Sequence, residues 1–96
     1  MFIVLLKFTA NKSKAGEFME DHNQWIKTGF DDGVFLLTGG LQPSLGGAVV
    51  AHNISLSELN TKVNEDPFIK EGIVKAEILE IDPKKADNRL SFLIGG

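Results

Sequence analysis

The order of strand-like and helix-like segments is the feature that most constrains the fold of this chain. Its hydrophobic pattern predicts a strand, a helix and a strand, and then a second strand, helix and strand. Two split βαβ units in this order form an α+β fold, the ferredoxin-like βαββαβ plait, in which a four-stranded antiparallel sheet carries two helices on one face. The predicted strands are residues 2–8, 34–38, 48–54 and 73–81, and the predicted helices are residues 14–30 and a second that begins after Ser55 and ends at Asp66.

Residues with known capping roles stand at the ends of both predicted helices. We expect Ser13 to cap the first helix, and Gly33 can take the left-handed conformation that ends it. Ser55 and Glu58 form a capping box at the start of the second helix. The dipeptide Asp66-Pro67 ends that helix, because a residue before proline is pushed out of the helical region, and the proline can open one further turn.

The segment 39–47 separates the two middle strands and is expected to be a loop or an open hairpin connection. It contains four glycines, Pro43 and Ser44. Gly39 and Gly40 can let a ligand approach the backbone closely, or they are ordinary turn residues. The segment matches neither the P-loop nor the dinucleotide-binding fingerprint.

Length and composition exclude several classes of protein. The 96 residues form one small domain, 1–96, with 43% hydrophobic and 24% charged residues, which is typical of a globular chain. A net charge of −3 with scattered lysines and arginines argues against a nucleic-acid partner. The absence of cysteine excludes disulfides and thiolate metal sites. The apolar runs are too short for a membrane span, and the first residues lack a signal peptide's cationic start, so we expect a cytoplasmic protein.

Only one face of the predicted sheet is covered by helices. An uncovered apolar sheet face is unusual for a soluble monomer, so we expect a homodimer that packs sheet to sheet, of the dimeric α+β barrel type. Residues 83–96 form a C-terminal extension with an apolar end that can act as a dimer arm. The apolar residues expected on the covered side are Ala15, Phe18, Met19, Trp25, Ile26 and Phe30 in the first helix, Leu56, Leu59 and Val63 in the second, and Val74, Ala76, Ile78 and, less regularly, Leu79 in the last strand.

His22 is the most informative polar residue, because it falls on the apolar stripe of the first helix with Phe18, Trp25 and Ile26. An imidazole there needs a hydrogen-bond partner or a neighbouring cavity. One interpretation is a histidine at the edge of the core that is bonded to a backbone carbonyl. The other is a general acid or base, which needs a second group to fix its tautomer.

Asp66 is the best candidate for that second group. The two helices of a plait lie side by side, so a residue midway along the first can meet one at the end of the second. Asp66 is equally explained as a helix stop or N-cap. Asp21 points about 100° away from His22 around the helix and is a poor partner.

The remaining candidates concern ligand binding and metals. Trp25 and Phe68 can line a pocket for a small molecule, although an aromatic residue at helical spacing is more often part of the core. His52 is expected at the solvent or at an interface. Two distant histidines without glutamates at ligand spacing make a zinc or iron site improbable, so we expect no metal and no cofactor.

These residues together resemble the YciI-like (YCII-related domain) family. The resemblance covers nearly the whole chain and rests on the apolar first strand, on His22 in the first helix, and on the run Asp32-Gly33-Val34-Phe35-Leu36-Leu37-Thr38-Gly39-Gly40. Its most specific part is Asp66-Pro67-Phe68 with Gly72 opening the last strand. The chain departs from the family at Gly40, where a proline often stands, since the nearest proline here is Pro43.

The resemblance implies a plait that dimerises through its sheet and an active site built on His22 and Asp66. Two functions follow as hypotheses. The first is a small-molecule enzyme in which the pair moves a proton during an elimination, an isomerisation or a hydrolysis. The second is a non-catalytic ligand-binding or sensor module in which the same pair orients a bound molecule.

Overall fold

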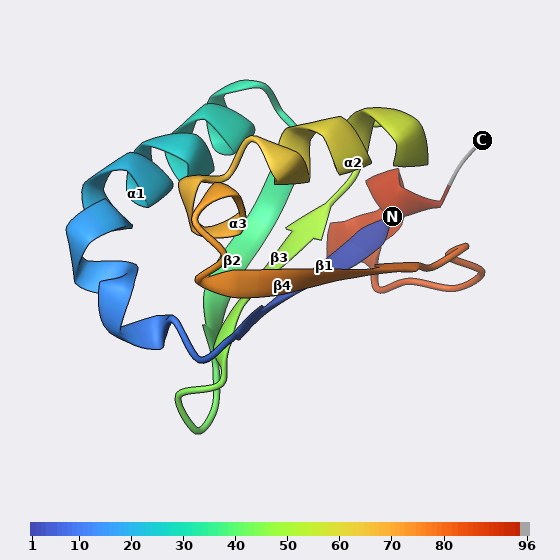
Figure 1. Cartoon of the computed structure of the whole chain (residues 1–96). Coiled ribbons are helices and arrows are strands. Elements are labelled where there is room, and N and C mark those ends of the chain that lie inside the picture. The colour runs from blue at the N-terminus through green and yellow to red at the C-terminus, as the bar shows by residue number, and fades with distance from the viewer. Residues whose placement is uncertain (95–96) are drawn as a thin grey trace.

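The computed structural model describes residues 1–94 and contains a single sheet covered on one side by helices (Figure 1). The strand order is β2-β3-β1-β4, and every neighbouring pair is antiparallel. This is the order of the ferredoxin-like plait, so the predicted fold class is confirmed. The strands are β1 (Phe2–Phe8), β2 (Phe35–Leu41), β3 (Gly46–Ala51) and β4 (Val74–Glu80), and the helices are α1 (Ala15–Asp31), α2 (Leu56–Asn64) and the short α3 (Pro67–Lys70).

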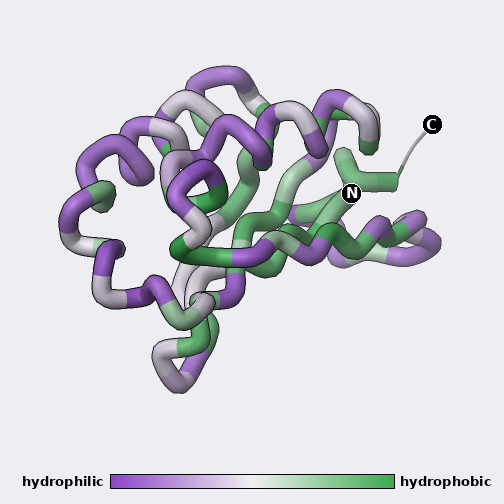
Figure 2. Tube along the Cα trace, in the orientation of Figure 1, coloured by the Kyte–Doolittle hydropathy of each residue, from purple (hydrophilic) through white to green (hydrophobic). Residues whose placement is uncertain are grey.

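The core lies between the sheet and the helices, as the alternation of β1 requires. Phe2, Val4 and Leu6 are almost completely buried and point toward the helices. Val49 of β3 lies beside Val4 on the same side, and Leu59 of α2 packs against this layer. In Figure 2 hydrophobic residues follow the strands, while hydrophilic residues predominate on the outer turns of the helices.

The local signals at the helix ends are confirmed with one exception. Gly33 takes a positive φ of 72° after α1, and Ser55 and Glu58 form both hydrogen bonds of a capping box. Ser13 does not cap α1, because it lies inside a 3₁₀ turn, Lys12–Lys14, that leads into the helix. The predicted cap was therefore wrong.

Of the two expectations for the glycine-rich segment, the hairpin connection is correct and the loop is wrong, because residues 39–41 belong to β2 and residues 46–47 to β3. Gly39 pairs with Ala48 and Gly40 pairs with Gly47, so only residues 42–45 form the turn. Gly46 has a φ of 136°, and a Cβ there would lie 2.0 Å from the Leu6 carbonyl oxygen. The ladder of β1 against β3 thus requires a glycine at this position.

The face of the sheet away from the helices is apolar over several strands. Strand alternation places Ile3 and Leu5 of β1, Val50 of β3 and Leu37 of β2 on this face. Leu79 pairs with Ile3 and also lies there, so its predicted place in the core was wrong. The apolar face expected from the sequence is therefore present.

Three helical residues predicted on the covered side are exposed, because each lies at the edge of the packed layer. Met19 lines a pocket beside α1, and Leu56 lines a groove beside β4. Phe30 packs edge-on against Phe35 with ring centroids 6.1 Å apart.

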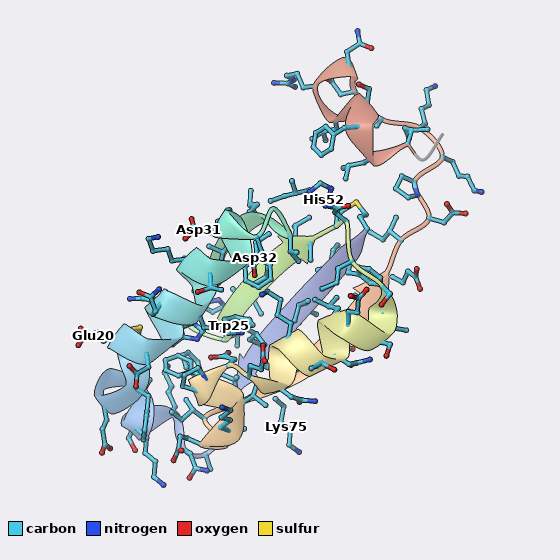
Figure 3. All side chains as sticks on the ribbon, turned by 90° about the horizontal axis from the view of Figure 1, so that it is seen from above. Glu20, Trp25, Asp31, Asp32, His52 and Lys75 are labelled. Atoms are coloured by element: carbon cyan, nitrogen blue, oxygen red, sulfur yellow. The ribbon has the colours of Figure 1, made fainter. Side chains whose placement is uncertain are left out.

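The C-terminal segment leaves the body of the molecule after β4 (Figure 3). It ends in a 3₁₀ turn, Asn88–Leu93, that is capped by Asp87, and hydrogen bonds from the backbone and side chain of Arg89 hold the pKa of that carboxyl below its usual range. The Phe92 ring contacts His52 with centroids 5.6 Å apart. Residues 95–96 of the predicted dimer arm lie outside the described residues. Over residues 1–94, no helix combines the length and the hydrophobicity that a membrane crossing needs.

Gly29 of α1 is predicted to be required for the packing of the first helix on the sheet. A Cβ at this position would lie 2.1 Å from the Phe35 ring, whereas a Cβ at Gly16 of the same helix would meet nothing within 4 Å. We expect Gly29→Ala to lower the free energy of unfolding by ~1–3 kcal/mol through overpacking. Gly16→Ala, the control, should raise it by ~0.5–1 kcal/mol. Urea unfolding of both variants tests this, and equal effects would contradict the packing argument.

Candidate active site

The structure brings His22 and Asp66 into direct contact. Nδ1 of His22 lies 2.7 Å from Oδ1 of Asp66, although the residues are 44 positions apart in the chain. The His22 side chain is 12% exposed and that of Asp66 is fully buried. Because an ionised carboxylate can only accept hydrogen bonds, Nδ1 donates and Nε2 is the nitrogen left for a bound molecule.

Asp66 is held in place by the local break between α2 and α3. Its backbone is extended, with φ −62° and ψ 124°, because Pro67 follows it. Oδ1 also accepts a hydrogen bond of 3.0 Å from the backbone N–H of Phe68, so the side chain caps α3. The two interpretations of Asp66, as an N-cap and as the partner of His22, are both correct and use the same oxygen.

The second carboxylate oxygen of Asp66 is buried without a hydrogen-bond partner. Within the part of the chain that the structure describes, Asp66 is also the single fully buried polar or charged side chain. An unsatisfied buried oxygen on a charged group is costly, and such exceptions concentrate at sites with a chemical role. The carboxylate therefore depends on His22 and on the Phe68 N–H for its stability.

Two aromatic side chains fix the plane of the His22 ring. The Phe68 ring is parallel to it within 2°, with centroids 3.9 Å apart. Trp25, one turn along α1, stacks more loosely at 5.9 Å. The indole N–H of Trp25 donates a hydrogen bond of 2.9 Å to the Lys62 carbonyl, and this bond connects α1 to the last turn of α2. His22 is thus clamped between its carboxylate and two rings.

His22 and Phe68 line a pocket between α1, α3 and the sheet, with a volume of ≈ 330 Å³. Gly40 and Gly47, paired across β2 and β3, face the helices here and leave space that side chains would otherwise fill. The lining residues are Leu6, Phe8, Met19, His22, Asn23, Ile26, Thr38, Gly39, Gly40, Gly46, Gly47, Ala48, Val49, Phe68 and Val74.

Three of the four residues predicted to contact a ligand lie on the pocket wall. They are Gly39, Gly40 and Phe68. Trp25 is buried behind His22 and is not a lining residue, because its ring packs into the core and its N–H is used by Lys62. Sequence reasoning did not find Thr38, which also lines the pocket. Its signal was a hydroxyl residue next to the glycine pair, and its place on the helix-facing side of β2 follows only from its pairing with Val49.

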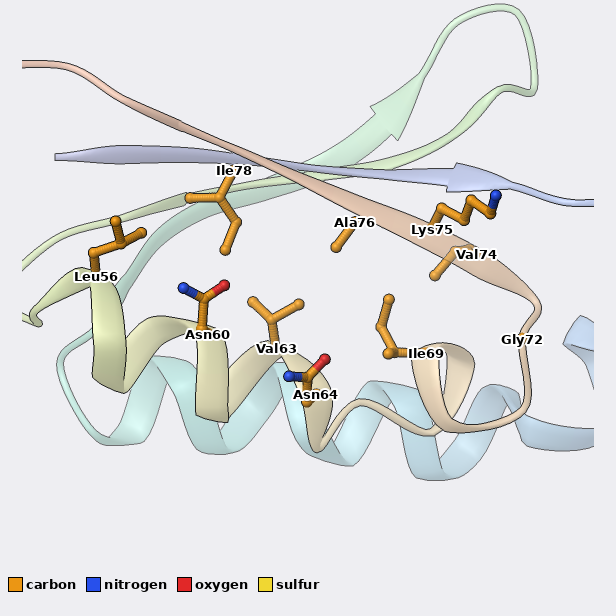
Figure 4. A pocket seen from close by; sticks show the side chains of 10 residues that line it. All are labelled: Leu56, Asn60, Val63, Asn64, Ile69, Gly72, Val74, Lys75, Ala76 and Ile78. Atoms are coloured by element: carbon orange, nitrogen blue, oxygen red, sulfur yellow. The ribbon is translucent and has the colours of Figure 1, made fainter.

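A larger hollow lies between α2 and β4, with a volume of ≈ 730 Å³ (Figure 4). Asn60 and Asn64 project into it from α2, opposite the apolar residues Ala76 and Ile78 of β4. It contains Lys75 but no acid–base pair, so the smaller pocket is the better candidate for chemistry. Nowhere in residues 1–94 do three His, Cys, Asp or Glu side chains cluster as metal ligands would.

Comparison with known proteins supports the fold. Neither a family model nor a curated protein sequence matches the chain. Among solved structures it is similar to 5-chloro-2-hydroxyhydroquinone dehydrochlorinase (TftG) from Burkholderia phenoliruptrix AC1100, in complex with 2,5-dihydroxybenzoquinone. The TM-score is 0.69 at 13% identity, and the match covers 84% of this chain and 93% of that one. This likeness establishes a shared fold.

The contact with Asp66 predicts the tautomer of His22. In the neutral ring we expect the proton on Nδ1, as measured by ¹⁵N–¹H NMR of the imidazoles, with His52 as the internal comparison. Asp66→Asn should keep this tautomer, because the Phe68 N–H holds the amide oxygen in the place of Oδ1. Asp66→Ala, which has no acceptor, should lose it. Protonation at Nε2 in the unaltered protein would contradict the geometry.

Proposed function

We propose that this chain is a YciI-like enzyme that transfers a proton on a small molecule, with His22 as the general acid or base. The observation that carries the proposal is the contact of 2.7 Å between His22 and the fully buried Asp66 at the wall of a pocket. A base held in one tautomer by a carboxylate contributes typically ~10²–10⁴-fold to a rate. This magnitude suits eliminations, isomerisations or hydrolyses of activated substrates.

In this mechanism Nε2 of neutral His22 takes a proton from the substrate, and the imidazolium that forms is stabilised by the Asp66 carboxylate. The same proton then returns to the product or to water. Asp66 does not reach the pocket and therefore acts as a positioning residue. The stacked rings of Phe68 and Trp25 keep Nε2 directed at one place during the transfer.

The likeness to TftG, which is named as a dehydrochlorinase, supports an enzyme over a purely structural role. It also supplies the first compound to assay, 5-chloro-2-hydroxyhydroquinone, whose loss of chloride is an elimination that needs a base. Binding of a small molecule without conversion would favour the alternative function, a ligand-binding or sensor module.

We also propose that the protein works as a homodimer that packs through its sheet, with residues 83–96 as an arm. The apolar face formed by Ile3, Leu5, Leu37, Val50 and Leu79 supports this assembly. Leu37 is 59% exposed in the isolated chain, which is unfavourable for a side chain facing water.

His22→Asn tests the proton transfer. The asparagine amide can still donate to Asp66, so the buried carboxylate keeps a partner, but it has no basic nitrogen. By contrast, His22→Ala would leave that carboxylate unpaired at a cost of ~3–5 kcal/mol and risks unfolding. We expect His22→Asn to lower kcat/KM by ~10²–10⁴-fold, in chloride release from 5-chloro-2-hydroxyhydroquinone or in turnover of related chlorinated hydroquinones and enolisable cyclic ketones. His52→Asn is the control, and unchanged turnover in His22→Asn would refute the mechanism.

Gly40 of β2 tests the position of the substrate. A side chain at Gly40 points toward the helices into the pocket, and its Cβ would meet no atom closer than 3.9 Å. We therefore expect Gly40→Val to fold normally but to reduce turnover at least about tenfold by occupying the pocket. Gly16→Val is the matched control and should retain turnover, because Gly16 of α1 does not line the pocket and a Cβ there would meet nothing within 4 Å. Circular dichroism verifies the fold, and equal activity of the two variants would place the substrate elsewhere.

A further inference from the structure

We infer that the pocket binds an uncharged, planar, single-ring molecule with a hydroxyl or carbonyl oxygen, and that the Thr38 hydroxyl binds that oxygen. The reaction at His22 rests on the proposed function, whereas the binding inference rests on the composition of the pocket. Of the residues among 1–94 that line it, only His22, Asn23 and Thr38 have polar side chains. All the others are apolar residues or glycines.

These three polar side chains lie on two sides of the pocket. His22 and Asn23 come from α1, and Thr38 comes from β2. Thr38 pairs with the buried Val49, so its side chain is on the helix-facing side of the sheet. A molecule between helix and sheet can therefore contact His22 on one side while the hydroxyl of Thr38 donates to or accepts from an oxygen on the other. Asn23 and Thr38 are both exposed, so the two residues lie at the rim of the pocket, on its helix side and its sheet side.

The charges around the pocket disfavour an anionic molecule. Behind His22 lies the Asp66 carboxylate, fully buried and with one oxygen unpartnered, so its negative field is poorly screened. No lysine or arginine is among the described lining residues. Lys12 approaches from outside: its ammonium group is 4.9 Å from the Phe8 ring centroid and donates to the Ser44 carbonyl. A carboxylate or phosphate placed in the pocket would thus lose its hydration without gaining a cation.

The shape of the pocket indicates a flat molecule of one ring. Its volume of ≈ 330 Å³ is near the lower end of the ~300–1,000 Å³ typical of ligand pockets. Gly40 and Gly47 form a strip of bare backbone on the sheet side. Phe8 and Phe68 add aromatic surface to the walls. A planar ring can lie flat on the glycine strip, whereas a bulky branched molecule would make no better contact with this strip.

Three probes of similar ring size separate the requirements for oxygen and for neutrality: resorcinol, meta-hydroxybenzoate and toluene. Their binding is followed by NMR titration of the backbone amides of residues 38–40 and 46–49. We expect resorcinol to bind, and meta-hydroxybenzoate to bind at least about tenfold more weakly because of its carboxylate. Thr38→Val should weaken resorcinol roughly three- to tenfold, the loss of one neutral hydrogen bond, and should leave toluene unchanged.

Thr61→Val is the matched control, since the Thr61 hydroxyl donates to the Ser57 carbonyl on α2, away from the pocket. The inference is overturned if resorcinol fails to bind at millimolar concentration, if the carboxylate binds equally well, or if Thr38→Val changes nothing. These outcomes are independent of the proton transfer. If resorcinol binding depends on Thr38 but turnover is unchanged in His22→Asn, the mechanism is refuted and the binding inference stands. If binding does not depend on Thr38 but turnover falls in His22→Asn, the binding inference is refuted and the mechanism stands.

Discussion

The burial of the Asp66 carboxylate is the constraint on which the candidate site depends. A charged group without access to water must be compensated by hydrogen bonds, and here a single oxygen receives both of them, from His22 and from the Phe68 N–H. One donor comes from α1 and the other from the first turn of α3, so the carboxylate joins the two βαβ halves of the plait. The fold places the pair together, and the pair in turn fixes how the two halves meet.

The rings around His22 extend this constraint to the pocket. A parallel stack with Phe68 and a looser contact with Trp25 leave the imidazole little rotational freedom. Trp25 also bonds to the end of α2, so both helices on the sheet contribute to the orientation of one side chain. This arrangement costs more free energy than a purely structural histidine requires, because a backbone carbonyl would accept the hydrogen bond from Nδ1 without the burial of a charge.

Features encoded by short-range interactions were predictable from the sequence, and features that depend on strand pairing were not. The capping box at Ser55, the left-handed Gly33 and the break at Asp66-Pro67 each arise within a few residues. The partnership of His22 with Asp66 was predictable because the plait alone brings the two helices together. The strand character of Gly39 and Gly40 depends on partners in β3, and the hydroxyl of Thr38 acquires its place only through that register.

The glycine pair on the sheet side has a consequence for how such a site can change over time. Gly40 and Gly47 belong to β2 and β3, whereas the His22–Asp66 pair is built from α1 and the α2–α3 junction. A single nucleotide change at a glycine codon can introduce a small side chain into the pocket while the acid–base pair stays intact. If the proposed function holds, the range of molecules accepted and the reaction are separable by mutation, and one scaffold can acquire new substrates while the His22–Asp66 pair stays unchanged.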